Sequence, residues 1–408
     1  MKIRSITYFC NPGYPLDEKK LRTAGLFTAE AKKAFEDAGF EVQTMRLATV
    51  PFPRLLGAGK INETPRLAER LAAVLPEAGI AYAALGPAQP DIPASYGVIP
   101  EAIAVSKNIF FSAILAAPRI GISLPAVHAC ARVIARTATL EPNGFANLQF
   151  AALANVPPGV PFFPAAYHEG DEPAFAVAVE AADLAVSAFE GAASVEEGRA
   201  KLISSIEIYA KQIVTVANLL KYRFSLRFGG IDFSLAPFPK EAQSIGTAFE
   251  RMGVPRAGLH GSLTAAAILT EAVDRADFPH AGFSGLMLPV LEDKVLAWRA
   301  AEGTLSVKDL LLFSAVCGTG LDTVPLPGDA SPEQISALLL DVAALALRLD
   351  KPLTARLMPI PGKKAGDPTG FTFDFFANSR VMALRAEPLK GPLAGEEVFT
   401  LRPRERHS

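Results

Sequence analysis

The chain has 408 residues, enough for one large domain or two ordinary ones, of which 50% are hydrophobic and 20% charged. This composition supports a sizeable packed core and excludes an intrinsically disordered protein. The formal net charge of -2, from 40 basic and 42 acidic residues, argues against a nucleic-acid-binding surface, because such surfaces carry a basic excess.

The mean hydropathy of +0.25 raises the question of a membrane segment. The most apolar stretch, ISALLLDVAALALRL, contains Asp341 and Arg348 and is shorter than the roughly 20 apolar residues of a spanning helix, so it predicts a buried helix. The N-terminal MKIRSITYFCNPG lacks the apolar region of a signal peptide. The cysteines (Cys10, Cys130 and Cys317) are an odd, widely spaced set, unlike a disulfide framework. We expect a soluble cytoplasmic protein.

The first part of the chain alternates between predicted strands and helices, which indicates α/β layering. Thr64 and Pro65 are typical of an N-cap followed by the first helical residue, and short apolar runs predict buried strands. The predicted strands are 3–9, 41–48, 80–85 and 109–115, and the predicted helices are 26–40 and the stretch that begins at Thr64.

Residues 140–171 are rich in Pro, Gly and Asn, which predicts a domain boundary or a long surface excursion. We divide the chain into an N-terminal α/β portion, 1–155, and a C-terminal portion, 156–408, within what we expect to be one compact unit. His168 lies in this stretch beside two acidic residues and could ligate a metal, but a solvated loop is the simpler interpretation because no second cluster accompanies it.

The second half again combines helices and strands. Ser194 and Glu197 fit a capping box at the start of a long helix that is predicted to end near Arg223, with one apolar face for the core or for a second copy of the chain. The later predicted elements are strands 229–236, 282–290, 354–360 and 371–376, a helix near 241–252, and a helix that starts from Ser331, Pro332 and Gln334.

Two groups of polar residues lie next to predicted strands. Asp232 and Ser234 alternate with apolar residues and so face one side of a strand, either toward a polar interior or toward water. Glu292 and Asp293 begin a helix, where the helix dipole alone favours carboxylates. Paired carboxylates could instead hold a divalent cation or transfer a proton, with Arg299 two turns further on.

The stretch VCGTGLDTVP is the third candidate. Its glycine-flanked backbone N–H groups could hold an anion or an oxyanion, although the ending of a P-loop is missing. A lone cysteine is more often an inert core residue than a nucleophile, and no histidine lies next to this one. The candidate residues are Cys317, Gly318, Thr319, Gly320, Asp322 and Thr323.

Arg356 on a predicted strand and Lys363 in a Gly/Pro loop form the fourth candidate. A solvated loop is the ordinary explanation for the lysine. The alternative is a clamp for an anionic group such as a carboxylate or phosphate.

Five ordered motifs, densest between Gly229 and Asp367, carry a resemblance to a known family: GGIDFSLAPFP, GFSGLMLPVLED, VCGTGLDTVPLPGD, KPLTARL and PGKKAGD. On these motifs nearly the whole chain resembles the uncharacterised family named domain of unknown function seven-eleven. The resemblance implies a mixed α/β barrel similar to the pyruvate formate-lyase-like fold, in which a finger loop enters the barrel.

In glycyl radical enzymes of that fold the finger loop carries a cysteine, and the resemblance makes Cys317 its analogue. The C-terminal stretch TGFTFDFFANSRVMALRAEPL lacks the Arg-Val-x-Gly-Tyr type of radical motif, and Gly370 lies in a different context. We therefore expect no glycyl radical as cofactor.

We expect an enzyme that acts on a small polar or anionic metabolite without a radical. Asp232, Glu292 and Asp322 are the acid/base or cation-binding candidates, with a divalent cation possible, and Cys317 is the candidate nucleophile or thiol base. The residues expected to bind the substrate are Ser234, Gly318, Thr319, Gly320, Thr323, Arg356 and Lys363. The alternatives are a metabolite-binding protein without activity and a homo-oligomeric scaffold, such as a homodimer, that uses the long helix as its interface.

Overall fold

The computed structural model describes residues 1–403. Within them an eleven-stranded mixed sheet forms the centre of the molecule, in the order β8-β7-β1-β2-β3-β4-β6-β10-β9, with β5 paired to β4 and β11 paired to β5. The strands are β1 (Lys2–Cys10), β2 (Val42–Thr49), β3 (Tyr82–Ala88), β4 (Ile109–Ala117), β5 (Gly121–Ser123), β6 (Phe150–Ala154), β7 (Ala174–Glu180), β8 (Arg227–Asp232), β9 (Gly320–Pro327), β10 (Leu353–Ile360) and β11 (Val398–Phe399).

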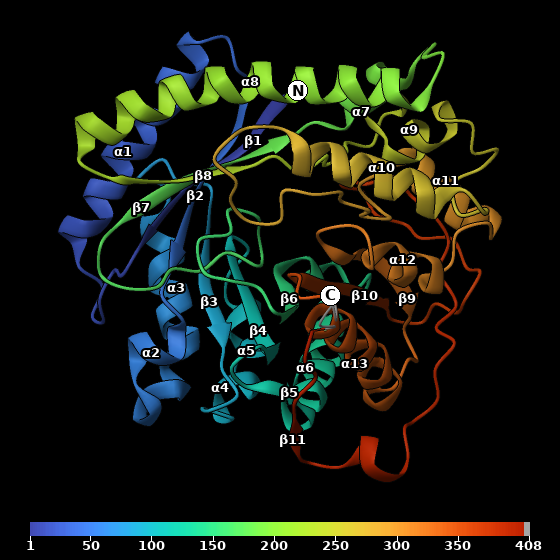
Figure 1. The fold of residues 1–408 in the computed structure, drawn as a ribbon. Helices are drawn as coiled ribbons and strands as arrows, with labels where there is room; N and C mark the ends of the chain where they lie inside the picture. The colour runs from blue at the N-terminus through green and yellow to red at the C-terminus, as the bar shows by residue number, and fades with distance from the viewer. Residues whose placement is uncertain (404–408) are drawn as a thin grey trace.

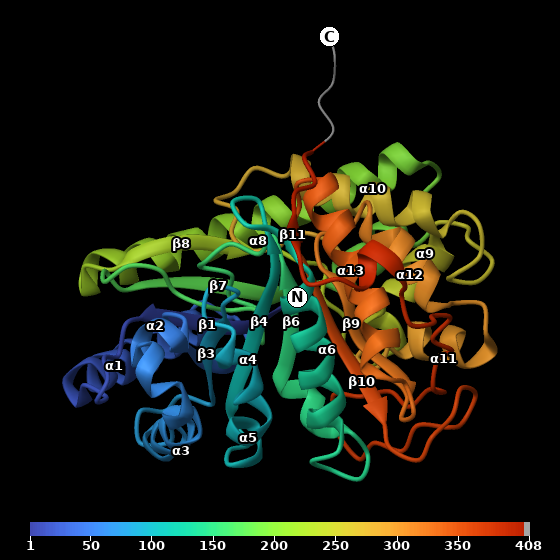
Figure 2. The same cartoon turned by 90° about the horizontal axis from the view of Figure 1, so that it is seen from below.

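Helices surround this sheet. Figure 1 shows α8 along one side of the molecule, over the end of the sheet that contains β1, β7 and β8. Figure 2 shows α1 to α3 beside the first strands and α6, α12 and α13 beside β9 and β10. The helices are α1 (Glu18–Asp37), α2 (Phe52–Leu56), α3 (Thr64–Val74), α4 (Ala94–Gly97), α5 (Ile99–Ala104), α6 (Leu124–Ala138), α7 (Ala182–Phe189), α8 (Val195–Phe224), α9 (Ile245–Arg251), α10 (Ser262–Arg275), α11 (Lys294–Glu302), α12 (Val307–Ser314) and α13 (Pro332–Arg348).

The two edge strands of the sheet both contact the segment 280–290. Isolated β-bridges join Ile231 to His280 and Leu235 to Leu286 on the β8 side, and Pro289 to Asp322 on the β9 side. This segment therefore lies between the first and the last strand of the sheet order, and strands from distant parts of the chain meet around it.

The mixed α/β class predicted from the sequence is confirmed, as are the predicted strands in β1 to β4 and β10. The capping box predicted for α13 is confirmed by Ser331 and Gln334. For α8 only half of the predicted box is present, because Ser194 accepts from the amide of Glu197 but the side chain of Glu197 accepts from the amide of Ala193. Thr64 as N-cap is wrong by one residue. It is the first residue of α3, and its hydroxyl donates to the carbonyl of Ile61 at 2.6 Å.

The predicted strand 371–376 is wrong. This stretch is irregular, and its phenylalanines pack against Phe145 and against one another instead of alternating between two faces of a sheet. The predicted strand 282–290 forms only the isolated bridges described above. Neither stretch forms the continuous backbone hydrogen bonding of a strand in the sheet.

The stretch around residue 160 is not the surface excursion expected from its prolines. Val160 and Ala166 are fully buried, and the hydroxyls of Ser5 and Thr7 on β1 donate to the carbonyl of Pro161 at 3.4 and 3.0 Å. Proline has no N–H group, so a proline-rich segment can be buried with fewer donors left to satisfy. His168, at the end of this segment, is 2% exposed and is not in a solvated loop. In the part of the chain that the structure describes, no helix is long and apolar enough to cross a membrane.

Candidate functional site

A cavity of about 150 Å³ lies among β1 to β4, β9 and β10. Further parts of the chain complete its wall: Leu148, Ala151, residues 162–165, residues 236–237, residues 283–292, Thr319 and the irregular stretch with Phe373 and Phe375. Three arginines and two carboxylates line it together with aromatic rings: Arg4, Arg46, Arg356, Glu292, Asp322, Tyr82, Phe110 and Phe163.

Two of the arginines belong to a chain of buried and partly buried ion pairs. Arg356 lies 2.5 Å from Asp322 (Nε to Oδ1) and 2.7 Å from Glu292 (Nη2 to Oε1). Arg4 lies 2.6 Å from the other oxygen of Glu292 and 3.1 Å from Glu180. The order is Glu180–Arg4–Glu292–Arg356–Asp322, so Glu292 holds one guanidinium on each of its oxygens.

Irregularities in the strands accompany two of these side chains. The register of β1 on β7 shifts between Ile3 and Ser5, at Arg4, and the register of β10 on β9 shifts at Arg356, where Asp322 and Thr323 face a single residue. A β-bulge re-aims a side chain and is common beside active sites. Thr323 has a φ of +41°, a backbone conformation that residues other than glycine rarely adopt.

The pKa values of the two carboxyl groups beside Arg356 are shifted in opposite directions. Burial raises the pKa of Asp322, and the neighbouring charge of Arg356 only partly opposes this effect. Burial also acts on Glu292, but Arg356 and Arg4 together outweigh it and lower the pKa of that carboxyl. Glu292 is therefore held ionised, and Asp322 is the easier of the two carboxyls to protonate.

Arg46 differs from the other two arginines because it has no carboxylate partner in residues 1–403. It is 9% exposed, and its Nε donates to the hydroxyl of Thr44 at 2.9 Å. The rings of Tyr82 and Phe163 lie 5.9 and 5.0 Å from its guanidinium carbon. Burial, followed by the charge of Arg4, lowers the pKa of Arg46 to about 9, so the group is still positively charged at pH 7.

Four of the residues predicted from the sequence line this cavity: Glu292, Thr319, Asp322 and Arg356. The others lie elsewhere. Lys363 lies in the loop after β10 and is not part of the lining. Thr323 accepts a hydrogen bond from the amide of Leu291 through its hydroxyl at 3.4 Å, outside the lining.

The glycines of the VCGTG stretch are explained by close backbone contacts. A Cβ on Gly318 would lie 2.9 Å from the carbonyl oxygen of Phe283, and one on Gly285 would lie 2.9 Å from Gly318. Gly320 has a φ of +94°, and a Cβ there would lie 2.3 Å from the carbonyl oxygen of Thr354. The glycines allow this loop to pack against residues 283–285, and only Thr319 among GTG lines the cavity.

The thiol of Cys317 is fully buried in the main apolar core and is not part of the cavity lining. Cys10 and Cys130 are buried as well, and burial raises the pKa of both thiols, that of Cys10 to about 12.

We therefore expect native protein at neutral pH to resist iodoacetamide at all three cysteines, because all three thiols are buried. Urea-unfolded protein is expected to take up three labels, as counted by intact mass spectrometry. Rapid and selective labelling of native Cys317 would contradict this prediction and would support the thiol chemistry considered from the sequence.

Asp232 and Ser234 are fully buried but are not part of the cavity lining. They contact the backbone of residues 283–285 instead. Asp232 accepts hydrogen bonds from the Ser234 hydroxyl at 2.6 Å and from the amides of Phe283 and Ser284 at 2.8 and 2.9 Å. These bonds hold the segment 280–290 against the end of β8. Burial raises the pKa of Asp232 to about 6, although its hydrogen bonds oppose the shift.

A raised carboxyl pKa predicts a specific pH dependence of stability. The folded state binds the proton of Asp232 more tightly than the unfolded chain, whose value is 3.8, so the free energy of unfolding falls as pH rises from 3.8 to about 6. The measurement is urea unfolding of wild type and of Asp232→Asn across this range, because the difference between them isolates this group. A difference that stays constant from pH 3.8 to 6 would show that the carboxyl is not perturbed.

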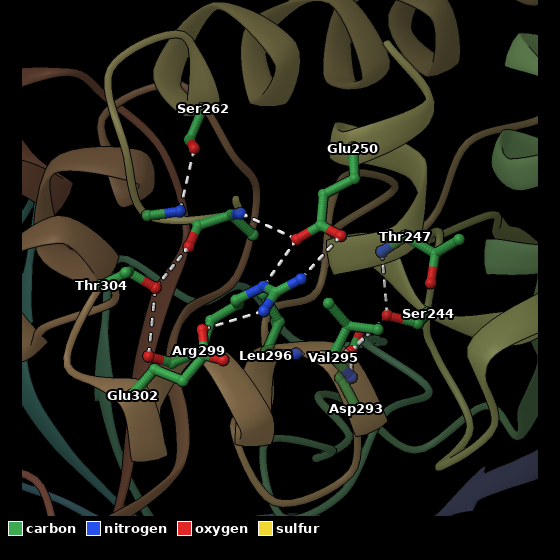
Figure 3. Close-up of polar contacts among 12 residues, drawn as sticks. Ser244, Thr247, Glu250, Ser262, Asp293, Val295, Leu296, Arg299, Glu302 and Thr304 are labelled. Atoms are coloured by element: carbon green, nitrogen blue, oxygen red, sulfur yellow. Dashed lines mark hydrogen bonds and ion pairs between the residues drawn. The ribbon is translucent and has the colours of Figure 1, made fainter. Parts of the chain in front are cut away.

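Asp293 and Arg299 belong to a separate network, shown in Figure 3. Asp293 caps α11, accepting from the amides of Val295 and Leu296 at 3.0 and 2.9 Å, and it also accepts from the Ser244 hydroxyl at 2.5 Å. Arg299 forms a two-point ion pair with Glu250 at 2.7 and 3.0 Å and a further pair with Glu302. These contacts tie α9 to α11, so the adjacent acids Glu292 and Asp293 have different structural roles.

Arg4 and Arg46 were missed from the sequence, although a signal was present. Each is a charged residue inside a predicted buried strand, where an arginine is rare unless it is paired. In the part of the chain that the structure describes, no group of three or more His, Cys, Asp or Glu residues could hold a metal ion. Glu292 and Asp322 are bridged by the guanidinium of Arg356.

Comparison with known proteins gives a family without an assigned activity. The UPF0210 protein of Pyrobaculum aerophilum is 34% identical over 365 residues, 86% of this chain and 79% of that protein. The UPF0210 protein of Methanopyrus kandleri is 32% identical over 374 residues, 86% of this chain and 81% of that one. The UPF0210 protein of Pyrobaculum arsenaticum is 37% identical over 255 residues, which span 56% of its length. The family described as Uncharacterised ACR (DUF711) matches residues 1–379, and the chain belongs to it.

Proposed function

We propose that the cavity binds a small anionic metabolite at Arg46 and that the carboxyl group of Asp322 transfers a proton to or from it. The observation that carries the proposal is the guanidinium of Arg46, which is buried, charged and without a carboxylate partner among residues 1–403.

An unpaired buried charge is costly. Removing one partner of a buried ion pair costs about 3–5 kcal/mol, because the remaining charge is left without compensation. The aromatic rings around Arg46 contribute about 0.5–2 kcal/mol by cation–π interaction, and they accept no hydrogen bonds from its free N–H groups. An anionic ligand would supply both the charge and the acceptors.

Asp322 is better suited to proton transfer than Glu292. Both oxygens of Glu292 are bound by arginines and its pKa is lowered, so it is a poor base and serves to position Arg4 and Arg356. Asp322 lines the cavity, one of its oxygens is held by Arg356, and its pKa is raised. A pair of carboxyls whose environments separate their pKa values is a common arrangement for acid/base catalysis. Elimination and isomerisation of an anionic metabolite are the reactions that fit.

The test is a thermal-shift screen of carboxylates and phosphates on wild type, Arg46→Gln and the control Arg132→Gln, which changes an exposed arginine of α6. We expect at least one anion to raise the melting temperature of wild type and of the control but not of Arg46→Gln. Equal responses in all three proteins would place the anion elsewhere, and no response in any of them would contradict the proposal.

We also propose that the sheet closes into a barrel similar to the pyruvate formate-lyase-like fold, with the chain as one compact unit. The support is the segment 280–290, whose backbone hydrogen bonds reach both edges: Leu235 donates to Gly285 at 2.8 Å, and Val290 donates to Asp322 at 3.1 Å. Hydrogen exchange at these two amides as slow as in β1 is the expected result, and rapid exchange there would contradict closure.

A homodimer through α8 is a second proposal, supported by large apolar side chains on its outer surface. Ile208, Leu219 and Tyr222 are 57%, 68% and 77% exposed. Sedimentation of wild type and Leu219→Glu would test it, with a shift from dimer to monomer expected.

The cytoplasmic location also stays a proposal, supported by three buried, free cysteines.

A further inference from the structure

We propose that the ligand of this cavity is a monocarboxylate with an apolar body, and that its binding is accompanied by the uptake of one proton at Asp322. This inference rests on the anion-binding function proposed above. It is carried by the charge balance of the cavity, by the donors left free at Arg46 and by the aromatic wall around them.

The formal charges around the cavity sum to zero before a ligand binds. Three arginines (Arg4, Arg46 and Arg356) and two carboxylates (Glu292 and Asp322) line the cavity, and the third carboxylate, Glu180, lies outside the lining and pairs with Arg4. A bound monoanion would leave one negative charge in a buried space, where uncompensated charge is strongly disfavoured. One proton on a carboxyl removes that charge, whereas a dianion would leave a second one.

Asp322 is the group to take up this proton. The charged groups that act on it are Arg356, Glu292 and Arg4, and the other titratable groups in the lining are Arg46 and Tyr82. Glu292 is held ionised by two arginines, so protonating it would break two ion pairs. Asp322 has one such contact, through Oδ1 to Arg356, and a proton on its other oxygen leaves that contact in place.

The donors at Arg46 fit a carboxylate. Arg46 lines the cavity, its Nε donates to the hydroxyl of Thr44, and no residue among 1–403 accepts a hydrogen bond from its Nη groups. The planar fork of a guanidinium binds the two oxygens of a carboxylate well. A phosphate has more acceptor oxygens and charge than one free guanidinium satisfies, and the lining, which lies within the described chain, includes neither lysine nor histidine.

The walls beside Arg46 fit an apolar body. Tyr82, Phe110 and Phe163 form a continuous aromatic cluster, with ring centroids 5.4 and 5.5 Å apart and edge-to-face geometry. Phe373 and Phe375 complete the lining. A ligand whose carboxylate binds the guanidinium would thus place its ring or short alkyl chain against these aromatic side chains. Burial of the apolar surface of the ligand contributes about 25 cal/mol for each Å². The volume of about 150 Å³ restricts the body to a small one.

The experiment is isothermal titration calorimetry of the full-length protein with benzoate, hexanoate, succinate and inorganic phosphate. Wild type, Arg46→Gln and Arg132→Gln are titrated with each probe in two buffers of different ionisation enthalpy. We expect benzoate or hexanoate to bind wild type and Arg132→Gln at least about tenfold more tightly than succinate and phosphate, and not to bind Arg46→Gln measurably. The difference between the two buffers should correspond to uptake of close to one proton.

Asp322→Asn separates the proton from the anion. The asparagine keeps an oxygen that can accept a hydrogen bond from Arg356, and it is neutral at every pH. We therefore expect this variant to bind the monocarboxylate without proton uptake. Its affinity should no longer fall as pH rises. Tighter binding of phosphate or succinate through Arg46 would overturn this inference but leave the proposed function standing. Unchanged proton uptake in Asp322→Asn would overturn the assignment of the proton. Failure of all four probes to bind wild type would contradict both the inference and the proposed function.

Discussion

Arg356→Met is expected to lower the free energy of unfolding by about 3–5 kcal/mol at pH 7. Arg356 is 8% exposed and binds Glu292 and Asp322 at 2.7 and 2.5 Å, so its removal leaves two buried carboxyls without their shared cation. Arg4 still binds Glu292 at 2.6 Å, but Asp322 keeps no ion pair in the described chain. Urea unfolding of both proteins measures the effect.

The pH dependence of this loss identifies its cause. Without Arg356 the pKa values of Glu292 and Asp322 are expected to rise, so the folded variant binds protons as pH falls from 7 toward 5 and the unpaired charge disappears. The difference in stability between wild type and variant should therefore shrink in that range. A loss that is small, or that does not change between pH 7 and pH 5, would show that the arginine contributes packing and not charge compensation.

Arg46→Met is expected to have the opposite effect on stability. Arg46 is buried to the same degree, at 9% exposed, but it has no carboxylate partner among residues 1–403, so replacing it removes a buried charge and breaks no ion pair. The negative charge that is then in excess around the cavity can be neutralised by a proton on Asp322. Methionine can fill the space between the rings of Tyr82 and Phe163, which now flank the guanidinium. We expect a gain of about 1–2 kcal/mol in the free energy of unfolding together with the loss of anion binding.

Arg356→Met and Arg46→Met are matched controls for each other. Each replaces a buried arginine of the same cavity lining by methionine. The charge account requires changes of opposite sign. If Arg46→Met is destabilised as strongly as Arg356→Met, then Arg46 is a structural residue and its lack of a partner does not indicate a ligand.

Local sequence patterns were sufficient to predict the elements that depend on neighbouring residues. The capping residues of α13, Ser331 and Gln334, and the apolar run of β10 act over a few positions, and both elements were predicted correctly. The strand predicted at 371–376 failed because its alternating phenylalanines pack against Phe145, which is distant in sequence. The buried proline-rich segment was misread for a similar reason, since its partners are hydroxyls on β1.

The candidate site was predicted in part. Glu292 and Arg356 were chosen because they lie after or within a predicted strand, and Asp322 because it follows the glycine-rich VCGTG stretch. The structure joins the three by ion pairs. Arg4 completes the chain of pairs from 288 positions away in the sequence, a contact that no local pattern contains. The glycines around Cys317 were interpreted as an anion-binding loop, whereas the structure uses them for close backbone packing.

Arg46 is the residue on which the functional account depends, and it is also the one with the weakest sequence signal. A single charged residue in an apolar strand can be a paired core residue or a ligand-binding residue, and only the positions of all neighbouring carboxylates distinguish the two. Those positions depend on the pairing of β1, β2, β9 and β10 across the whole sheet.

The most direct measurement is native mass spectrometry of the protein as purified, with Arg46→Gln and Arg132→Gln prepared in parallel. The account predicts that wild type and Arg132→Gln carry, or can be loaded with, a small anionic molecule that Arg46→Gln does not retain. Retention of the same molecule by Arg46→Gln would contradict the claim that this buried arginine is an anion-binding site.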